Sequence, residues 1–237
     1  EVSVSDKTTD QLLAAYKNGT ASEAEKRQLE VMLFQYGRYL TLGSSREDSQ
    51  LPSNLQGVWN YLNSPPWSSD YHMNVNLQMN YWPTYSTNLA ECAQPLIDYV
   101  DSLREPGRVT AQVYFGIGNG ADEATGFTAH TQNTPFGWTC PGWSFDWGWS
   151  PAAVPWILQN CWEHYEFTGD VDYMRENIYP MLKEEAIFYD KTLVKDGEGK
   201  LVSAPSYSPE TGPRTAGNTY EQTLTWQLYQ DAITAAE

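Results

Sequence analysis

The segment APSYSPETG, residues 204–212, places a single carboxylate, Glu210, next to residues that restrict the backbone. Pro205 and Pro209 fix φ on either side of Tyr207, so we expect a stiff loop. A carboxylic acid held on such a loop, partly buried beside an aromatic ring, can act as a general acid in glycoside hydrolysis. An ordinary solvated glutamate fits the same pattern, and composition alone leaves both interpretations open.

A second polar feature interrupts the largely apolar segment YHMNVNLQMNYWP, residues 71–83, which contains three asparagines. Asn74 and Asn76 are two residues apart, so their amides would face the same way in an extended segment and diverge in a helix. Neutral amides can orient a water molecule or a carboxylate without adding charge. The alternative is a pair of helix-cap or turn residues.

No metal, phosphate or nucleophile motif accompanies these residues in the sequence. The histidines are far apart and belong to no HExxH or CxxC unit, so no metal site is predicted. The glycine-rich segment GIGNGADE lacks the lysine of a phosphate-binding loop, and GxSxG is absent. We therefore expect neither a metal nor another cofactor.

Helical patterns dominate the rest of the chain. Ser22 and Glu25 form a capping box before a helix that ends near Gly43, and a shorter helix over residues 9–18 precedes it. The segment that follows His72 is expected to form a short helix up to Pro83.

Three later segments are also helical in pattern. A helix over residues 90–105 is predicted to end at Pro106-Gly107, and another is predicted to end at Gly169. Residues 170–194 are helical with a break near Pro180. The last helix begins with Asn218 and Glu221, which resemble a capping box.

Two long irregular segments, residues 44–72 and 116–151, separate these helices. The second contains four tryptophans between glycines, and some of them should line a cleft because a loop cannot bury them all. The segment KDGEGKLVSAPSYSPETGP, residues 195–213, is predicted to form a small hairpin that turns at Gly197 or Gly199, followed by a loop.

Composition limits the classes of partner. The chain has 237 residues, of which 41% are hydrophobic and 19% charged, and its formal net charge is −16. This charge argues against nucleic acid and anionic membrane surfaces as partners. No apolar run approaches the roughly 20 residues that span a bilayer.

The sparse cysteines give no disulfide framework; free buried thiols are expected, although one pair could bridge. The 10 Trp and 16 Tyr suit a carbohydrate ligand, and equally a bulky core.

These elements predict an all-α fold. Pairs of helices joined by long loops are typical of an α/α toroid, in which the loops build one face. The last helix continues to Glu237 without a stop signal, so we expect residues 1–237 to form roughly the N-terminal half of a single toroidal domain.

Several quoted segments occur in a long, ordered series: RYLTLGSSRED, LPSNLQGVWN, PPWSSDYHMNVNLQMNYWPTYSTNLAECAQPL, WEHYEFTGD and LVSAPSYSPE. From about Phe34 to its end, the sequence resembles the catalytic domain of glycoside hydrolase family 95. That family comprises inverting 1,2-α-L-fucosidases, with some members that act on α-L-galactosides. The resemblance implies an (α/α)6 barrel.

The resemblance also implies roles for three residues. The family's general acid is a Glu in an SPE motif, which corresponds to Glu210. Two asparagines of an N-x-N motif, here Asn74 and Asn76, activate an Asp that acts as the general base. In the family that Asp lies beyond the position of Glu237, so this chain alone is expected to be inactive.

The tryptophan-rich segment departs from the family pattern. It reads HTQNTPFGW, with Thr134 in place of an Asp, and then AAVPWIL, which retains a tryptophan. Sugar contacts are expected here, so the sequence leaves open fucose, another L-sugar or an unrelated glycoside. The residues expected to bind the sugar are His130, Trp138, Trp147, Trp149 and Trp156, although the tryptophans could equally belong to the core.

The expected substrate is therefore an oligosaccharide or glycan, and family habit suggests a secreted or periplasmic bacterial protein. Two alternatives stay open. A non-catalytic carbohydrate-binding helical module would bind sugar regardless of Glu210, and a scaffold domain would have no sugar affinity. The sequence does not predict an oligomeric state.

Overall fold

The computed structural model describes residues 4–142 and 144–237, and this part of the chain is mostly helical, as predicted. The α-helices are α1 (Thr9–Lys17), α2 (Glu23–Ser44), α3 (Asn76–Tyr81), α4 (Pro83–Ser86), α5 (Gln94–Ser102), α6 (Arg104–Phe115), α7 (Phe145–Gly148), α8 (Ala153–Thr168), α9 (Val171–Tyr173), α10 (Tyr179–Thr192) and α11 (Thr219–Ala236). Short 3₁₀ segments cover Pro66–Ser69, Ala90–Ala93 and Glu123–Thr125, and a π-helical turn covers Met174–Ile178.

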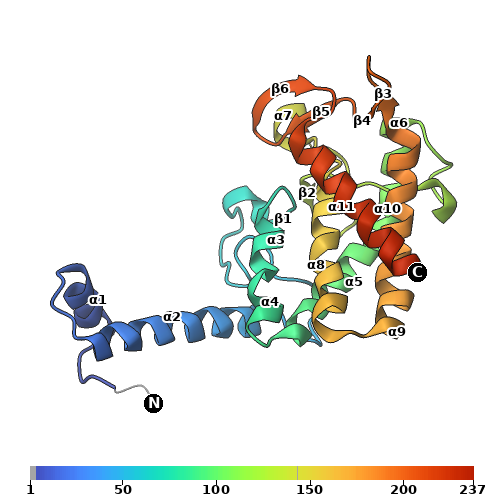
Figure 1. The fold of residues 1–237 in the computed structure, drawn as a ribbon. Coiled ribbons are helices and arrows are strands. Elements are labelled where there is room, and N and C mark those ends of the chain that lie inside the picture. The colour runs from blue at the N-terminus through green and yellow to red at the C-terminus, as the bar shows by residue number, and fades with distance from the viewer. Residues whose placement is uncertain (1–3, 143) are drawn as a thin grey trace.

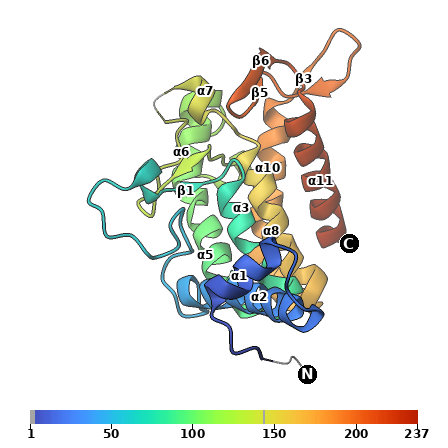
Figure 2. The ribbon, with the colours of Figure 1, turned by 90° about the vertical axis from the view of Figure 1, so that its left-hand side faces the viewer.

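The predicted capping box at the start of α2 is confirmed. The Ser22 hydroxyl accepts a hydrogen bond from the Glu25 amide at 3.3 Å, and the Glu25 carboxylate accepts one from the Ser22 amide at 3.0 Å. Figure 1 shows that α2 extends away from the other helices, and Figures 1 and 2 both show α1 against α2. We call residues 4–44 the N-terminal arm.

The hydrophobic core lies between α5, α8, α10 and α11, and α8 contacts α5, α10 and α11. Apolar residues recur on one face of each helix, which buries that face against its neighbours. Apolar side chains that these helices bury almost completely, each at most 2% exposed, include Leu96, Ile97, Ile157, Leu158, Met181, Leu182, Phe188 and Leu228.

The prediction that a helix ends at Pro106-Gly107 is wrong, because α6 continues through both residues. Since α6 begins at Arg104, Pro106 lies in the first turn, where a missing N–H removes no intrahelical hydrogen bond. A Cβ at Gly107 would lie 2.8 Å from the carbonyl oxygen of Thr128. This glycine therefore permits a close approach between α6 and the chain at Thr128.

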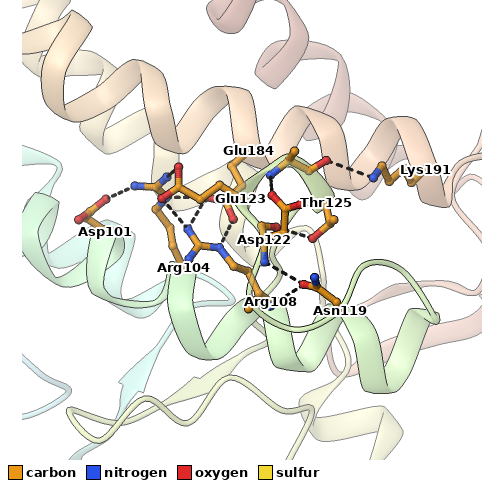
Figure 3. Close-up of polar contacts among 11 residues, drawn as sticks. Asp101, Arg104, Arg108, Asn119, Asp122, Glu123, Thr125, Glu184 and Lys191 are labelled. Atoms are coloured by element: carbon orange, nitrogen blue, oxygen red, sulfur yellow. Dashed lines mark hydrogen bonds and ion pairs between the residues drawn. The ribbon is translucent and has the colours of Figure 1, made fainter.

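A buried ion-pair cluster joins α6 to α10 (Figure 3). Glu184, which is 2% exposed, accepts hydrogen bonds from Arg108 Nε and Arg104 Nε, both at 2.6 Å. Arg104 also pairs with Asp101 at 2.8 Å, and the exposed Glu123 lies 3.4 Å from both arginines. Two guanidinium groups thus compensate one carboxylate that is removed from water.

The predicted helix ends in the second half of the chain are confirmed. Gly169 ends α8 in the left-handed conformation, with φ 67°. The break near Pro180 is a π-helical turn that precedes α10, and Pro180 occupies the first turn of α10.

Six short strands form three antiparallel pairs among the described residues. They are β1 (Tyr71–His72) with β2 (Gln132–Asn133), β3 (Val194–Lys195) with β4 (Leu201–Val202), and β5 (Ser206–Ser208) with β6 (Thr211–Thr215). The predicted hairpin turns at Gly199, where φ is 83°. The loop predicted after it is wrong, because residues 206–215 form the second hairpin, β5–β6.

Cys92, Cys140 and Cys161 are free thiols, and Cys92 and Cys161 are buried. Within residues 4–142 and 144–237, none of the helices combines the length and the apolar character needed to cross a membrane.

Candidate active site

Glu210 lies in the two-residue turn of the β5–β6 hairpin. Ser208 pairs with Thr211, so Pro209 and Glu210 alone connect the strands. Glu210 has φ 67°, in the left-handed region that glycine or asparagine usually occupies. Proline followed by a residue with positive φ is the pattern of a type II turn. A non-glycine residue in this conformation costs about 1 kcal/mol or more, and such strain clusters at functional sites.

The asparagine segment changes from strand to helix between its two central amides. β1 ends at His72, Asn74 lies in the following turn, and Asn76 is the first residue of α3. The amide of Met73 donates to Thr131 O at 2.7 Å, and Gln78 Nε2 donates to Met73 O at 2.7 Å, which fixes the turn from both sides.

The third asparagine of the segment has a different environment. Asn80 Nδ2 donates to Asn54 O at 3.1 Å and so ties α3 to the long loop before β1. The segment therefore contains one structural asparagine and two that face the same hollow.

Glu210, Asn74 and Asn76 line one cavity of about 700 Å³. The other described residues that line it are Leu55, Gln56, Trp67, His72, Val75, Trp156, Ser208, Pro209 and Tyr220. One wall comes from residues 55–76, and the opposite wall comes from the β5–β6 turn and the start of α11. The cavity thus combines polar groups with aromatic faces, as carbohydrate sites do.

A hydrogen bond connects the two walls. Asn74 Nδ2 donates to Glu210 Oε1 at 3.2 Å, although the residues are 136 positions apart in the chain. Asn74 Oδ1 is buried and has no hydrogen-bond partner among the described residues. The general acid was expected to be partly buried, but Glu210 is exposed in the described chain.

His72 is a cavity residue that the sequence analysis considered only as a possible metal ligand. Its Nδ1 lies 2.9 Å from Asp70 Oδ1, and both side chains are about nine-tenths buried, at 9% and 11% exposure. This contact fixes the orientation of the imidazole. The i, i+2 spacing of Asp70 and His72 was the available signal, since both side chains share a face of an extended segment.

Of the residues predicted to bind sugar, Trp156 is the one that lines the cavity. Its ring meets that of Tyr220 edge-to-face, with centroids 5.7 Å apart. Tyr220 lies in the first turn of α11 and its hydroxyl is 3.2 Å from the Ser150 hydroxyl. The two rings supply the aromatic surface of this part of the cavity.

His130 and Trp149 instead lie in the interior behind the hairpin. His130 is 0% exposed, and its ring centroid is 4.9 Å from that of Trp149. The Ser150 amide donates to His130 Nδ1 at 3.0 Å, and burial lowers the pKa of His130 to about 3. Trp149 Nε1 donates to Pro205 O at 3.3 Å, so this ring supports the hairpin from below.

Trp138 and Trp147 are 49% and 56% exposed, and neither is among the described residues that line the cavity. The structure therefore brings Glu210, Asn74, Asn76 and Trp156 together and leaves the other predicted residues outside. Among the described residues, no three His, Cys, Asp or Glu side chains form a group that could hold a metal ion.

A carboxylate and two amides that converge beside aromatic rings define a site of the kind found in carbohydrate-active proteins. Comparison with known families agrees with this class, since residues 1–237 match the glycosyl hydrolase family 95 catalytic domain. The chain belongs to this family.

Curated relatives carry related names. The chain is 38% identical over 236 residues to "Probable alpha-fucosidase A" of Aspergillus niger. This alignment covers 96% of the present chain and 28% of the relative. It is also 38% identical over 216 residues to "Alpha-L-fucosidase 2" of Arabidopsis thaliana, covering 87% of this chain and 25% of that protein. The chain thus spans about a quarter of the length of these relatives.

Proposed function

We propose that this chain supplies the general-acid side of an inverting exo-glycosidase that hydrolyses terminal α-L-fucosides. The observation that carries the proposal is the hydrogen bond from Asn74 to Glu210 across a cavity that Asn76 and Trp156 also line. The names of the relatives favour fucosides, and α-L-galactosides are the second candidate.

In the proposed reaction, Glu210 donates its proton to the glycosidic oxygen while the bond from that oxygen to the anomeric carbon breaks. A water molecule attacks the same carbon from the opposite face and gives up a proton to a carboxylate base. Inverting enzymes hold their two carboxyl groups ~6.5–9.5 Å apart, which leaves room for this water.

The two asparagines would position the base and the attacking water. Asn74 Oδ1 has no partner among the described residues, which leaves one acceptor of this amide unused beside Glu210. Asn76 can act on the base through its amide. We place the base, an Asp, in sequence that follows Glu237, in a single (α/α)6 domain that continues from this chain. By itself, the chain is then expected to be inactive, and the complete protein to be secreted or periplasmic.

Substitution of the acid in the complete protein tests this proposal. Glu210→Gln keeps the size of the side chain but cannot donate a proton, so kcat for an α-fucosylated oligosaccharide should fall by about 10²- to 10⁴-fold while KM changes little. Glu198→Gln is the matched control, because Glu198 is an exposed glutamate in the neighbouring hairpin. NMR of the first sugar released should show the anomer opposite to that of the substrate.

A near-native rate for Glu210→Gln would refute the assignment of the acid. Retention of the anomeric configuration would refute the single-displacement mechanism. If the purified protein bound the sugar with unchanged affinity in all variants and hydrolysed none of the substrates, a carbohydrate-binding module would be the better interpretation.

A further inference from the structure

A buried carboxylate lies beneath the hairpin that carries Glu210. Glu221, in the first turn of α11, is 2% exposed. Its Oε2 accepts a hydrogen bond from the Ser206 hydroxyl at 2.7 Å, and its Oε1 accepts one from the Tyr189 hydroxyl at 3.2 Å. Burial raises the pKa of Glu221, so this position is costly for a carboxylate.

Ser206 joins this carboxylate to the hairpin. It is the first residue of β5 and is 0% exposed. Its hydroxyl donates to Glu221 and also accepts a hydrogen bond from the Asn218 amide at 3.3 Å. Glu210 follows four residues later, in the turn of the same hairpin. The position of Ser206 therefore influences the position of the Glu210 carboxyl group.

Glu221 has an alternative bonding arrangement that it does not use. In a capping box, the carboxylate of the third helical residue accepts a hydrogen bond from the N-cap amide. Here the side-chain oxygen Asn218 Oδ1 accepts a hydrogen bond from the backbone amide of Glu221 at 2.9 Å. The backbone amide of Asn218, however, donates to the Ser206 hydroxyl and not to the Glu221 carboxylate. The Glu221 carboxylate is thereby directed to the hairpin, and only half of the predicted capping box forms.

The same helical turn also contributes to the cavity. Tyr220 lines the cavity, and the adjacent Glu221 holds the stem of the hairpin. One turn of α11 therefore carries both an aromatic wall of the site and the support of the acid.

We propose that Glu221 is a positioning residue for Glu210 and acts through its hydrogen bond to Ser206. This inference rests on the proposed function, in which Glu210 donates a proton to the leaving group. Proton transfer requires the acid to lie within hydrogen-bond reach of that oxygen, and a displacement of about 1 Å can cost about 10²-fold in rate.

The test compares two variants that each remove one hydrogen bond from the same carboxylate. Ser206→Ala removes the hydrogen bond between Glu221 and the hairpin, and Tyr189→Phe removes the hydrogen bond between Glu221 and α10. The two variants are comparable because both positions are almost fully buried. We expect Ser206→Ala in the complete enzyme to lower kcat for an α-fucosylated oligosaccharide about 10- to 100-fold with little change in KM. Tyr189→Phe should stay within about 3-fold of the native kcat, because it leaves the hairpin bond intact.

Leaving-group dependence separates positioning from general loss of structure. A dinitrophenyl glycoside departs without a proton from an acid, so Ser206→Ala should hydrolyse it within about 3-fold of the native rate. Glu221→Gln, combined with Ser206→Ala, should cost no more than Ser206→Ala alone, since both act through one hydrogen bond. If Ser206→Ala does not fold, Ser206→Cys retains the shape with a weaker donor and replaces it.

Equal losses with both leaving groups, or equal effects of Ser206→Ala and Tyr189→Phe, would overturn the positioning role. Glu210→Gln in the same series distinguishes this failure from failure of the proposed function. If Glu210→Gln is slow while Ser206→Ala is native-like, the acid assignment stands and the inference falls. If Glu210→Gln is native-like, the proposed function itself falls.

Discussion

Single residues in this protein take their roles from burial more than from their type. His130 was predicted to contact sugar, yet it lies inside the protein with Nδ1 accepting from the Ser150 amide. Its Nε2 is buried and has no partner among the described residues. The ring is therefore neutral in the folded protein, and protonation would place an uncompensated charge in the interior.

His130 should make stability depend on pH. Its folded pKa is about 3 against an ordinary value of 6.5, so below pH 6.5 the unfolded chain binds a proton that the folded chain does not. The contribution is fully present above pH 6.5 and declines as pH falls toward 3, by up to about 1.4 kcal/mol per pH unit. Urea unfolding of the native protein and His130→Gln between pH 4 and 7 measures the difference in slope. Equal slopes would show that folding does not lower the pKa of His130.

At the scale of elements, the contact of α6 with α10 depends on one buried carboxylate. Glu184 receives three hydrogen bonds from Arg104 and Arg108, whereas Glu123, at 3.4 Å from both, is 69% exposed. Solvent screens the outer pair, and the inner pair has already lost its hydration.

These two glutamates should therefore differ in their effect on folding. Glu184→Ala leaves two partly buried guanidinium groups without their partner and should reduce the free energy of unfolding by about 3–5 kcal/mol. Glu123→Ala should cost about 1 kcal/mol or less. Urea titration followed by circular dichroism gives both values. Similar costs for the two variants would contradict the role assigned to burial.

At the scale of the molecule, the N-terminal arm packs mainly on itself. Gln28 and Ser44 are the buried residues among those described in α2, and Gln28 Oε1 accepts from the Ser5 amide within the arm. Leu33, Phe34 and Tyr39 are more than half exposed. The arm meets the core at its end, where the Ser45 hydroxyl is 2.8 Å from the Tyr81 hydroxyl.

Removal of residues 1–36 should thus leave the helical core folded. Ser45 keeps its hydrogen bonds to Tyr81 and to Cys92 O in this variant. We therefore expect the free energy of unfolding to change by less than about 1 kcal/mol, or 2–4 °C in Tm for a chain of this size. Thermal melts by circular dichroism measure the shift. Loss of the cooperative transition would show that the arm belongs to the core.

Local signals made part of this structure predictable. The capping box of Ser22 and Glu25 acts through hydrogen bonds within a few residues, and its prediction is confirmed. The helix end at Gly169 and the turn at Gly199 depend on local backbone freedom, and both predictions are confirmed. Pro106 was misjudged because its effect depends on where the helix begins, and α6 begins at Arg104, which places Pro106 in the first turn. The β5–β6 hairpin was missed because its two prolines suggested a loop, although an edge strand tolerates proline.

The residues of the candidate site were predictable where a sequence motif specified them. They were not predictable where tertiary packing determines which side chains are buried. Glu210, Asn74, Asn76 and Trp156 meet in one cavity, and their spacing in the chain gives no reason for this without the resemblance. The aromatic-rich segment supplied no such guide, since an exposed Trp147 and a buried Trp149 are two residues apart. Which of them is covered depends on the hairpin that follows more than fifty residues later.

The partnership between Asn74 and Glu210 has a consequence for biogenesis. During synthesis, the first wall of the cavity leaves the ribosome well before the turn of the second hairpin exists. Loop closure over such a separation is entropically demanding and follows the formation of local helices. The cavity is therefore one of the last features that this part of the polypeptide acquires, and nascent chains that end before the hairpin lack its second wall.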